Sequence, residues 1–169
     1  AEVLLMAGAD PNKGPYASGN PVSEAYNNRD DRMKGLLLRH GGVLEASFAA
    51  LEGETAAAAV HLHANPEHAD KLLWSAGCGG DSNLAGLCLR YLNFESEDNR
   101  WMTLLEQPLR LWRLNPHRQF PDFDRTVYPE IFRMILEHGA SPNVVGRFGY
   151  RLAHHLAATG TVWGRHTVM

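Results

Sequence analysis

Short apolar clusters followed by a glycine recur along the chain, and each has the pattern of a helix that ends. Three apolar residues, two variable residues and then a glycine place the glycine where a chain leaves a helix with positive φ. The segments with this pattern are 3–8, 36–41 and 134–139, and Gly8 and Gly41 lie 33 residues apart. Pro11 and Pro142, which follow the first and last segments, prevent those helices from continuing. The pattern therefore predicts helices that end at a regular interval.

Polar and glycine-rich stretches follow the first and last of these helix ends. They cover residues 13–19 and 144–150, and each comes directly after an asparagine, Asn12 or Asn143. Glycine and polar residues between periodic segments are typical of loops. We therefore expect turns that project from the helices, with a new helix beyond each turn.

Apolar spacing and helix breakers predict the remaining elements. We expect helices near 21–28, 31–39, 47–52, 54–64, 99–113 and 127–138. Segment 71–81 is another apolar cluster with glycines, and a second helix over 84–89 follows it. The glycine-rich residues 77–80 of this segment predict a turn between the two helices. Pro108 should kink the helix over 99–113 or begin a new one, and a Pro- and Arg-rich insertion follows at 114–125.

A known family has this combination of motifs. A leucine pair followed by Gly-Ala-Asp-Pro-Asn at 8–12, with an interval of 33 residues, resembles the ankyrin repeat. That repeat opens its first helix with Thr-Pro-Leu-His-x-Ala. Residues 20–25 and 151–158 stand in the same phase, and they keep the proline (Pro21) and the histidine (His154) of that motif, respectively. The resemblance implies an all-α, ankyrin-type helical solenoid with short projecting turns and one irregular insertion.

In this register the chain is a single array over residues 1–169. Its expected parts are a partial repeat at 1–12, a repeat at 13–45, a short degenerate repeat at 46–65, a repeat at 67–92, a divergent repeat at 93–143 and a truncated repeat at 144–169. The chain begins at Ala1, without an initiating Met and inside an apolar helix, so we expect its native N-terminus to lie upstream. Open repeats at both ends predict exposed apolar faces and self-association.

The resemblance implies a function in binding. A single helix pair buries too little apolar surface to offset its ordering entropy, so stacked pairs stabilise one another and form a broad surface without an enclosed pocket. The family's implied activity is a non-catalytic protein–protein interaction, with an unidentified protein as partner. We expect the contact residues on the projecting turns: Lys13, Tyr16, Ser18, Arg147, Phe148 and Tyr150.

Composition narrows the possible partners. A formal charge of −3 gives no general attraction to nucleic acid or to an anionic membrane. No apolar run approaches the ~20 residues that cross a bilayer. The two cysteines, Cys78 and Cys88, have neither a disulfide-framework nor a metal-site spacing, which is typical of buried thiols in a reducing compartment such as the cytoplasm.

Candidate chemical groups favour packing over catalysis. His61, His63 and His68 lie near Cys78 in sequence and form a conceivable zinc site. Positions 61 and 63 of a helix, however, point about 200° apart, and His68 lies beyond a helix-breaking proline. His154 occupies the family's structural histidine position, and no nucleophile or nucleotide-binding motif is present. We therefore predict no catalytic residue, metal or cofactor.

Three alternatives remain open. The array could be the recognition or regulatory part of a larger enzyme or effector whose catalytic domain lies outside this segment. A small helical enzyme with a metal or histidine site is a second possibility. The third is contact with nucleic acid through aromatic residues interleaved with arginines in the divergent segment: Trp101, Arg110, Trp112, Arg113, Arg118, Phe120 and Arg125. The favoured interpretation of this segment places the tryptophans in a core and the arginines in solvent, because Glu106, Asp122 and Asp124 dilute the positive charge. Recognition of a protein partner through the insertion comes next, ahead of nucleic acid.

Overall fold

The computed structural model describes residues 1–14, 20–114, 127–146, 149–151, 153 and 154, with side chains omitted over 107–129. Across these residues the chain is mostly helical. The described part holds no strand, and its only extended pairing is an antiparallel bridge between Val145 and Arg151. The predicted all-α class is thus confirmed.

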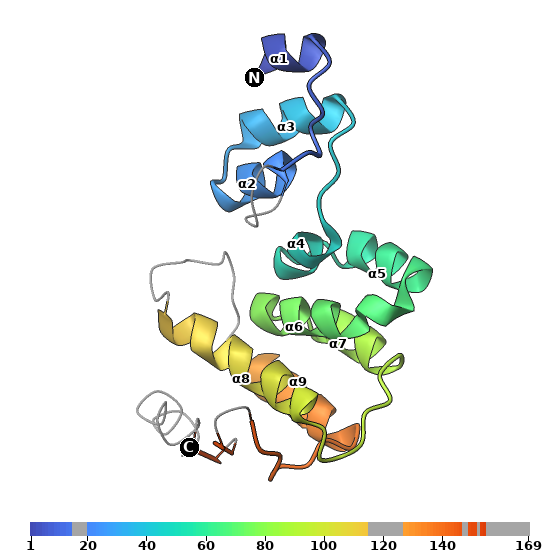
Figure 1. Ribbon diagram of the computed structural model, residues 1–169, viewed down its shortest axis with the longest axis vertical. Helices are drawn as coiled ribbons and strands as arrows, with labels where there is room; N and C mark the ends of the chain where they lie inside the picture. Colours follow the sequence, from blue (N-terminus) through green and yellow to red (C-terminus); the bar gives the residue numbers. More distant parts are fainter. Residues whose placement is uncertain (15–19, 115–126, 147–148, 152, 155–169) are drawn as a thin grey trace. The chain divides into compact units, whose positions relative to one another are not determined.

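The chain forms two compact units, Ala1–Ala49 and Ala50–Met169. The first unit contains α1 (Glu2–Met6), α2 (Pro21–Asn27) and α3 (Asp31–Arg39), and α4 (Ala46–Leu51) crosses the boundary (Figure 1). The second unit contains α5 (Thr55–Ala64), η1 (Pro66–His68), α6 (Ala69–Gly79), α7 (Ser82–Leu89), α8 (Asn99–Leu114) and α9 (Val127–Glu137). The predicted helices match these elements to within one or two residues at most ends.

In the first unit, α2 and α3 form a helical hairpin whose helices each begin at a side-chain cap. The Oδ1 atom of Asn20 accepts a hydrogen bond from the backbone N–H of Ser23 at 2.9 Å. Asp30 caps α3 in the same way, through the N–H of Met33 at 2.8 Å. Such caps satisfy backbone donors that a helix start leaves without partners. The small core between the helices consists of Val22, Ala25 and Leu37, with Leu5, Tyr26, Met33 and Leu44 packed against it.

In the second unit, α6 and α7 form a corresponding hairpin. Gly80 ends α6 in the left-handed conformation, with φ of 76°, and Asp81 caps α7 through the N–H of Leu84 at 2.9 Å. The predicted pair of helices is confirmed, but the predicted turn over 77–80 is too long, because α6 continues through Gly79. At Gly79 an added Cβ would lie 2.5 Å from the carbonyl oxygen of Leu51, so glycine permits close packing of α6 against the end of α4.

The core of the second unit lies among α6, α7, α8 and α9. Its largest fully buried side chains include Trp101, Leu72, Leu73, Leu84, Met102, Leu105 and Ile135. The indole N–H of Trp101 donates to the carbonyl of Glu95 at 3.0 Å, which satisfies its one polar atom. Helix α8 runs without interruption through Pro108. Of the two expected effects of Pro108, the start of a new helix is therefore wrong, and the kink stays a prediction, since a proline inside a continuous helix is accommodated by bending it.

Two predicted segments fall largely outside the described residues. The insertion at 114–125 lies there except for Leu114, the last residue of α8. Of the segment at 144–169, the structure describes 144–146, 149–151, 153 and 154. Segment 134–143, which the ankyrin resemblance requires to be a helix end, is the end of α9 followed by a turn.

Candidate partner-binding surfaces

The three predicted helix ends share one hydrogen-bonding geometry. Gly8, Gly41 and Gly139 have φ angles of 91°, 84° and 115°, where a side chain would be strained. In each case the N–H of the glycine donates to the carbonyl three residues back. The next N–H donates to the carbonyl five residues back, and these bonds measure between 2.9 and 3.4 Å. A 33-residue interval in the sequence thus corresponds to the same turn in the structure.

In the first unit, the side chain of Asn12 joins the loop after α1 to the loop after α3. Its Nδ2 atom donates to the carbonyl of Gly41 at 3.0 Å, and its Oδ1 atom accepts from the N–H of Val43 at 2.7 Å. One amide side chain therefore supplies both a donor and an acceptor, as a neighbouring backbone segment would. The two loops lie side by side as a result.

Asn20 also binds the loop that follows α3. Its Nδ2 atom donates to the carbonyl of Val43 at 2.6 Å, and its backbone N–H donates to Oε1 of Glu45 at 3.0 Å. Asn20 is buried and also caps α2. It stands where the ankyrin motif has threonine, and it ties the start of a helix to the loop that follows the next helix.

The second unit joins two of its own loops in a similar way. The Nε2 atom of His138 lies 3.0 Å from the carbonyl of Leu92, and the N–H of Ser141 donates to the carbonyl of Ser96 at 2.8 Å. A carbonyl only accepts, so Nε2 of His138 carries the proton in this contact. In both units, therefore, loops that follow different helices are hydrogen-bonded edge to edge.

Only two of the six predicted contact residues lie among the described residues. Lys13 is exposed in the turn after α1. Tyr150 is 53% exposed, beside a tight turn in which the N–H of Gly146 donates to its carbonyl at 2.8 Å. Its ring contacts that of His154, with 6.0 Å between centroids. Tyr16, Ser18, Arg147 and Phe148 lie outside the described residues. Lys13 belongs to the first unit and Tyr150 to the second.

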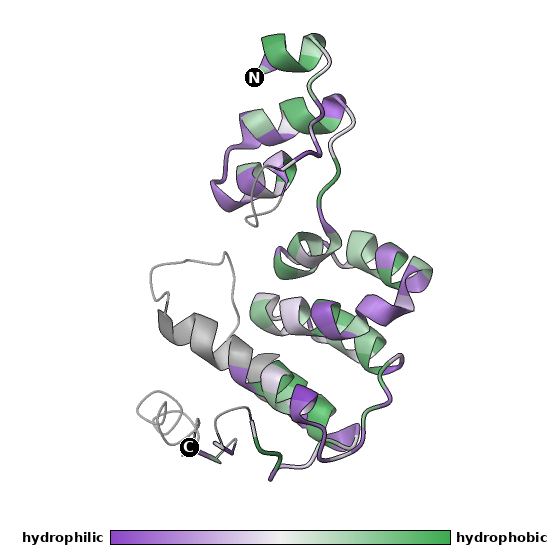
Figure 2. Ribbon diagram, viewed as in Figure 1, coloured by the Kyte–Doolittle hydropathy of each residue, from purple (hydrophilic) through white to green (hydrophobic). Residues whose placement is uncertain are grey.

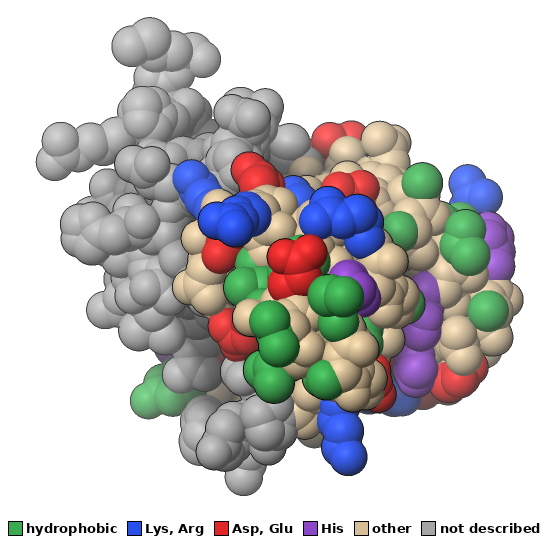
Figure 3. Space-filling view, turned by 90° about the horizontal axis from the view of Figure 1, so that it is seen from above, with side chains coloured by type: hydrophobic (Ala, Val, Ile, Leu, Met, Phe, Trp, Pro, Cys, Tyr) green, Lys and Arg blue, Asp and Glu red, His purple; other side chains and the backbone are tan. Residues whose placement is uncertain are grey.

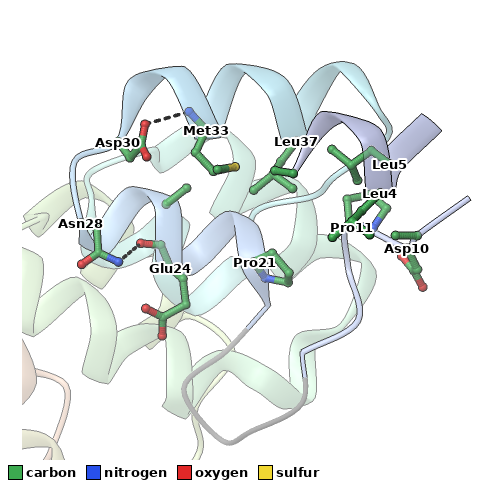
Figure 4. A pocket seen from close by; sticks show the side chains of 13 residues that line it. Leu4, Leu5, Asp10, Pro11, Pro21, Glu24, Asn28, Asp30, Met33 and Leu37 are labelled. Carbon is green, nitrogen blue, oxygen red and sulfur yellow. Dashed lines mark hydrogen bonds between the residues drawn. The ribbon is translucent and has the colours of Figure 1, made fainter. Parts of the chain in front are cut away.

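Sequence analysis missed a hollow in the first unit, which is bounded by α1, α2 and α3 (Figure 4). It has a volume of about 600 Å³. Leu4 and Leu5 of α1 line it together with Met33 and Leu37 of α3. Three carboxylates, Asp10, Glu24 and Asp30, also line it, and none of its described lining residues is a lysine or an arginine. The first unit thus carries an apolar recess with an acidic border.

Helix α1 leaves most of its apolar side chains in solvent. Val3, Leu4 and Met6 are between 65% and 80% exposed. The ribbon of α1 is almost entirely hydrophobic in Figure 2, and hydrophobic side chains gather at the α1 end of the molecule in Figure 3. The predicted exposed apolar face is confirmed at this end of the chain. The other end lies outside the described residues.

The histidines of the conceivable zinc site engage two different partners. His61 and His68 stack with 5.2 Å between ring centroids, and Nε2 of His61 lies 2.9 Å from Nδ1 of His68. The 3-10 helix η1 brings His68 back beside α5, so the expectation that Pro66 separates His68 from the histidines of α5 is wrong. His63 instead contacts the hydroxyl of Tyr91, at 2.7 Å. Among the described residues no three histidine, cysteine or acidic side chains converge as metal ligands.

Both cysteine thiols are buried and remain protonated near neutral pH. Burial raises the pKa of Cys78 and of Cys88 from 9.0 to about 12, and the carboxylate of Asp81 contributes to the shift at Cys88. A thiol reacts as its thiolate, so neither sulfur has the character of a nucleophile. Both cysteines are free rather than paired in a disulfide.

No family model and no curated protein matches the chain. The resemblance to ankyrin repeats therefore rests on the sequence motifs quoted above. Among the described residues, none of the helices combines the length and the apolar character needed to cross a membrane.

Proposed function

We propose that the chain is a non-catalytic protein-binding module of ankyrin type, which recognises a protein partner through its projecting turns. The observation that carries this proposal is the pairing of successive loops by Asn12, whose amide bonds to Gly41 and Val43. Loops fixed side by side present neighbouring turns as one continuous surface. Rigid loops on a helical scaffold bind at a lower entropic cost than mobile loops.

The exposed side chains on these turns support recognition of a protein. Tyr150 is a large side chain with a polar tip, and tyrosine is enriched among residues that dominate binding energy at interfaces. Lys13 supplies a cation on the turn after α1. Tyr16, Ser18, Arg147 and Phe148 are proposed as contact residues from the positions of the two turns in the sequence alone.

The described reactive groups give further support to binding over catalysis. His61 and His68 contact each other, and His63 contacts the hydroxyl of Tyr91. Each of these histidines thus already has a side-chain partner. The thiols of Cys78 and Cys88 are protonated and enclosed. Two free, buried thiols also fit a protein of the reducing cytoplasm.

The test is affinity capture of a partner with the whole chain, followed by calorimetric titration of that partner with variants. Tyr16→Ala and Tyr150→Ala should each weaken binding at least about tenfold, since a truncated anchor loses its buried contact area. Val60→Ala is the control, because Val60 is exposed on α5 and belongs to neither turn. Equal affinity for all three variants, with unchanged Tm, would remove the turns from the interface.

A further inference from the structure

Two histidine rings meet where the chain turns from α5 into η1. Nε2 of His61 and Nδ1 of His68 lie 2.9 Å apart, and the planes of the two rings lie within 11° of parallel. Pro66 does not separate the two side chains, because η1 returns the chain toward α5. Two imidazole nitrogens, which belong to the commonest metal-binding side chain, thus face each other.

One residue, Asn65, fixes the backbone of both histidines. Its N–H and its Nδ2 atom both donate to the carbonyl of His61, at 2.9 and 3.1 Å. Its own carbonyl accepts from the N–H of His68 at 3.0 Å. The neighbouring Leu62 and Ala69 are buried in the core and hold the chain on either side of this turn. The two rings are therefore preorganised, which lowers the entropic cost of binding an ion between them.

The separation of the two nitrogens is close to that in a metal site. Zn²⁺ bonds to imidazole nitrogen at about 2.0–2.1 Å, so two such ligands at a tetrahedral angle lie about 3.3–3.4 Å apart. The nitrogens of His61 and His68, at 2.9 Å, must therefore separate by about 0.4–0.5 Å. Both side chains are half-buried, so they can make this small shift, and water can reach the ion from outside.

The ion takes the place of a shared proton. In the neutral pair, one of the two facing nitrogens carries a hydrogen and donates it to the other. An ion between the rings requires both facing nitrogens to be bare, so the donor ring carries its proton on its far nitrogen instead. Each ring stays neutral and keeps one proton. Binding to the neutral pair therefore releases no proton.

The neighbouring groups define how many ligands the chain supplies. Nδ1 of His63 contacts the hydroxyl of Tyr91, and positions 61 and 63 of a helix point about 200° apart. Burial raises the pKa of Cys78 to about 12, whereas a cysteine binds metal as its thiolate. Segment 54–70 contains no lysine or arginine, so it holds no fixed positive charge that repels a cation. The described residues thus offer two ligands, and water completes the coordination.

We propose that His61 and His68 form a two-histidine binding site for a divalent transition metal ion, Zn²⁺ or Cu²⁺. Imidazole nitrogen is a preferred ligand of both ions, whereas Mg²⁺ and Ca²⁺ prefer oxygen. With water in its remaining positions, the site exchanges its ion with solvent, unlike a closed structural site with four protein ligands. The bound ion joins α5 to η1. No residue of the projecting turns takes part, so the site stands independently of the proposed function.

Isothermal titration calorimetry of the full chain with zinc chloride measures this binding. The wild type should bind Zn²⁺ with a Kd below about 100 µM. His61→Ala and His68→Ala should each weaken binding at least about tenfold, because each removes one of two ligands. His63→Ala is the matched control, since it removes a histidine of the same helix and should change the Kd less than about twofold.

Two outcomes of the titration overturn the proposal. The first is absence of binding by the wild type at about 1 mM Zn²⁺. The second is an equal effect of His61→Ala and His63→Ala, whether both weaken binding or neither does, because the ion then lies elsewhere. Circular dichroism of each variant without metal should match that of the wild type, since none of the three side chains belongs to the buried core.

Nuclear magnetic resonance of the wild type tests the site without any substitution. Zn²⁺ should shift the ring signals of His61 and His68 more than those of His63, and Mg²⁺ should shift none of them. Excess Zn²⁺ should also raise the Tm of the wild type, because the ion binds the folded chain, and leave that of a variant with both alanines unchanged. Equal shifts with Mg²⁺, or an equal rise of Tm in that variant, would contradict the site.

Discussion

At the scale of single residues, one amide holds two loops of the first unit together. Asn12→Ala removes both of its bonds, to Gly41 and Val43, and should lower the free energy of unfolding of this unit by about 1–2 kcal/mol. The loss is limited because water replaces the side chain at this exposed position. Urea unfolding of the variant measures it. Lys13→Ala is the control, and its effect should stay within about 0.5 kcal/mol; equal effects would contradict a role for the amide.

Asp81 performs two tasks in the second unit. Its carboxylate caps α7 through the N–H of Leu84 and also accepts a hydrogen bond from the hydroxyl of Thr55. Asp81→Ala should therefore destabilise this unit by about 1–3 kcal/mol, more than the loss of a cap alone. Thermal unfolding provides the measurement. Asp81→Asn keeps the capping oxygen and should recover about half of the loss; a variant as unstable as alanine would show that the charge is required.

The buried thiols predict a loss of stability at alkaline pH. Burial raises the pKa of Cys78 and Cys88 from 9.0 to about 12. Between these values the unfolded chain releases two protons that the folded chain retains, so the free energy of unfolding falls as pH rises. The slope is about 1.4 kcal/mol per pH unit for each thiol, and the full contribution is present below pH 9.

Urea titrations at pH 8, 9.5 and 10.5 measure this slope. A Cys78→Ala and Cys88→Ala double variant should show a shallower decline than the wild type, whatever its stability at pH 8. All other ionisable groups are the same in the two proteins, so their contributions cancel in the comparison. Parallel declines would contradict the burial of the thiols.

At the scale of elements, the sequence predicted those helix starts and ends that depend on residues close to one another in the chain. The hairpin of α2 and α3 follows from Asn20 and Asp30 as caps and from Gly41 at the helix end, all of which act within a few residues. The continuation of α6 through Gly79 depends instead on the end of α4, more than twenty residues earlier. The hollow escaped prediction for the same reason, since three helices and a loop form it and no single segment carries its pattern.

Two of the helical glycines, Gly35 and Gly79, show the difference between helix propensity and packing. Alanine in a helix normally stabilises a protein by about 0.4–1 kcal/mol relative to glycine. Gly35→Ala should do so, since the added Cβ lies 3.5 Å from Arg39, an ordinary contact. Gly79→Ala should instead destabilise by about 1–3 kcal/mol, because the new atom meets the carbonyl oxygens of Ala50 and Leu51 at 2.9 and 2.5 Å. Urea unfolding gives both signs, and stabilisation by Gly79→Ala would contradict the packing of α6 on α4.

At the scale of the whole molecule, the two units differ in the size of their cores. Among the described residues, the buried core cluster of the first unit consists of Val22, Ala25 and Leu37. That of the second includes Trp101, Leu105 and Ile135. A segment of fewer than about 60 residues buries a smaller fraction of its surface than a larger domain does, so its stability alone is marginal. We therefore expect the first unit to open at a lower free energy than the second.

Hydrogen exchange followed by mass spectrometry tests this difference. Amides of α2 and α3 should exchange faster than those of α6 and α7, because opening of the smaller core is less costly. Gly35→Ala should slow exchange in α2 and α3 and leave α6 and α7 unchanged. Uniform exchange across all four helices would indicate that the chain opens as one cooperative body.

The bonds made by Asn12 have a consequence for how this surface changes over evolution. They use one side-chain amide and the backbone of Gly41 and Val43, and the side chain of Lys13 takes no part in them. Mutations at the tip of that turn can therefore accumulate without breaking the hydrogen bonds that join the two loops. Under the proposed function, a lineage would exchange one binding target for another by changing these tips alone, while selection for a stable scaffold would act on Asn12 and on the glycines.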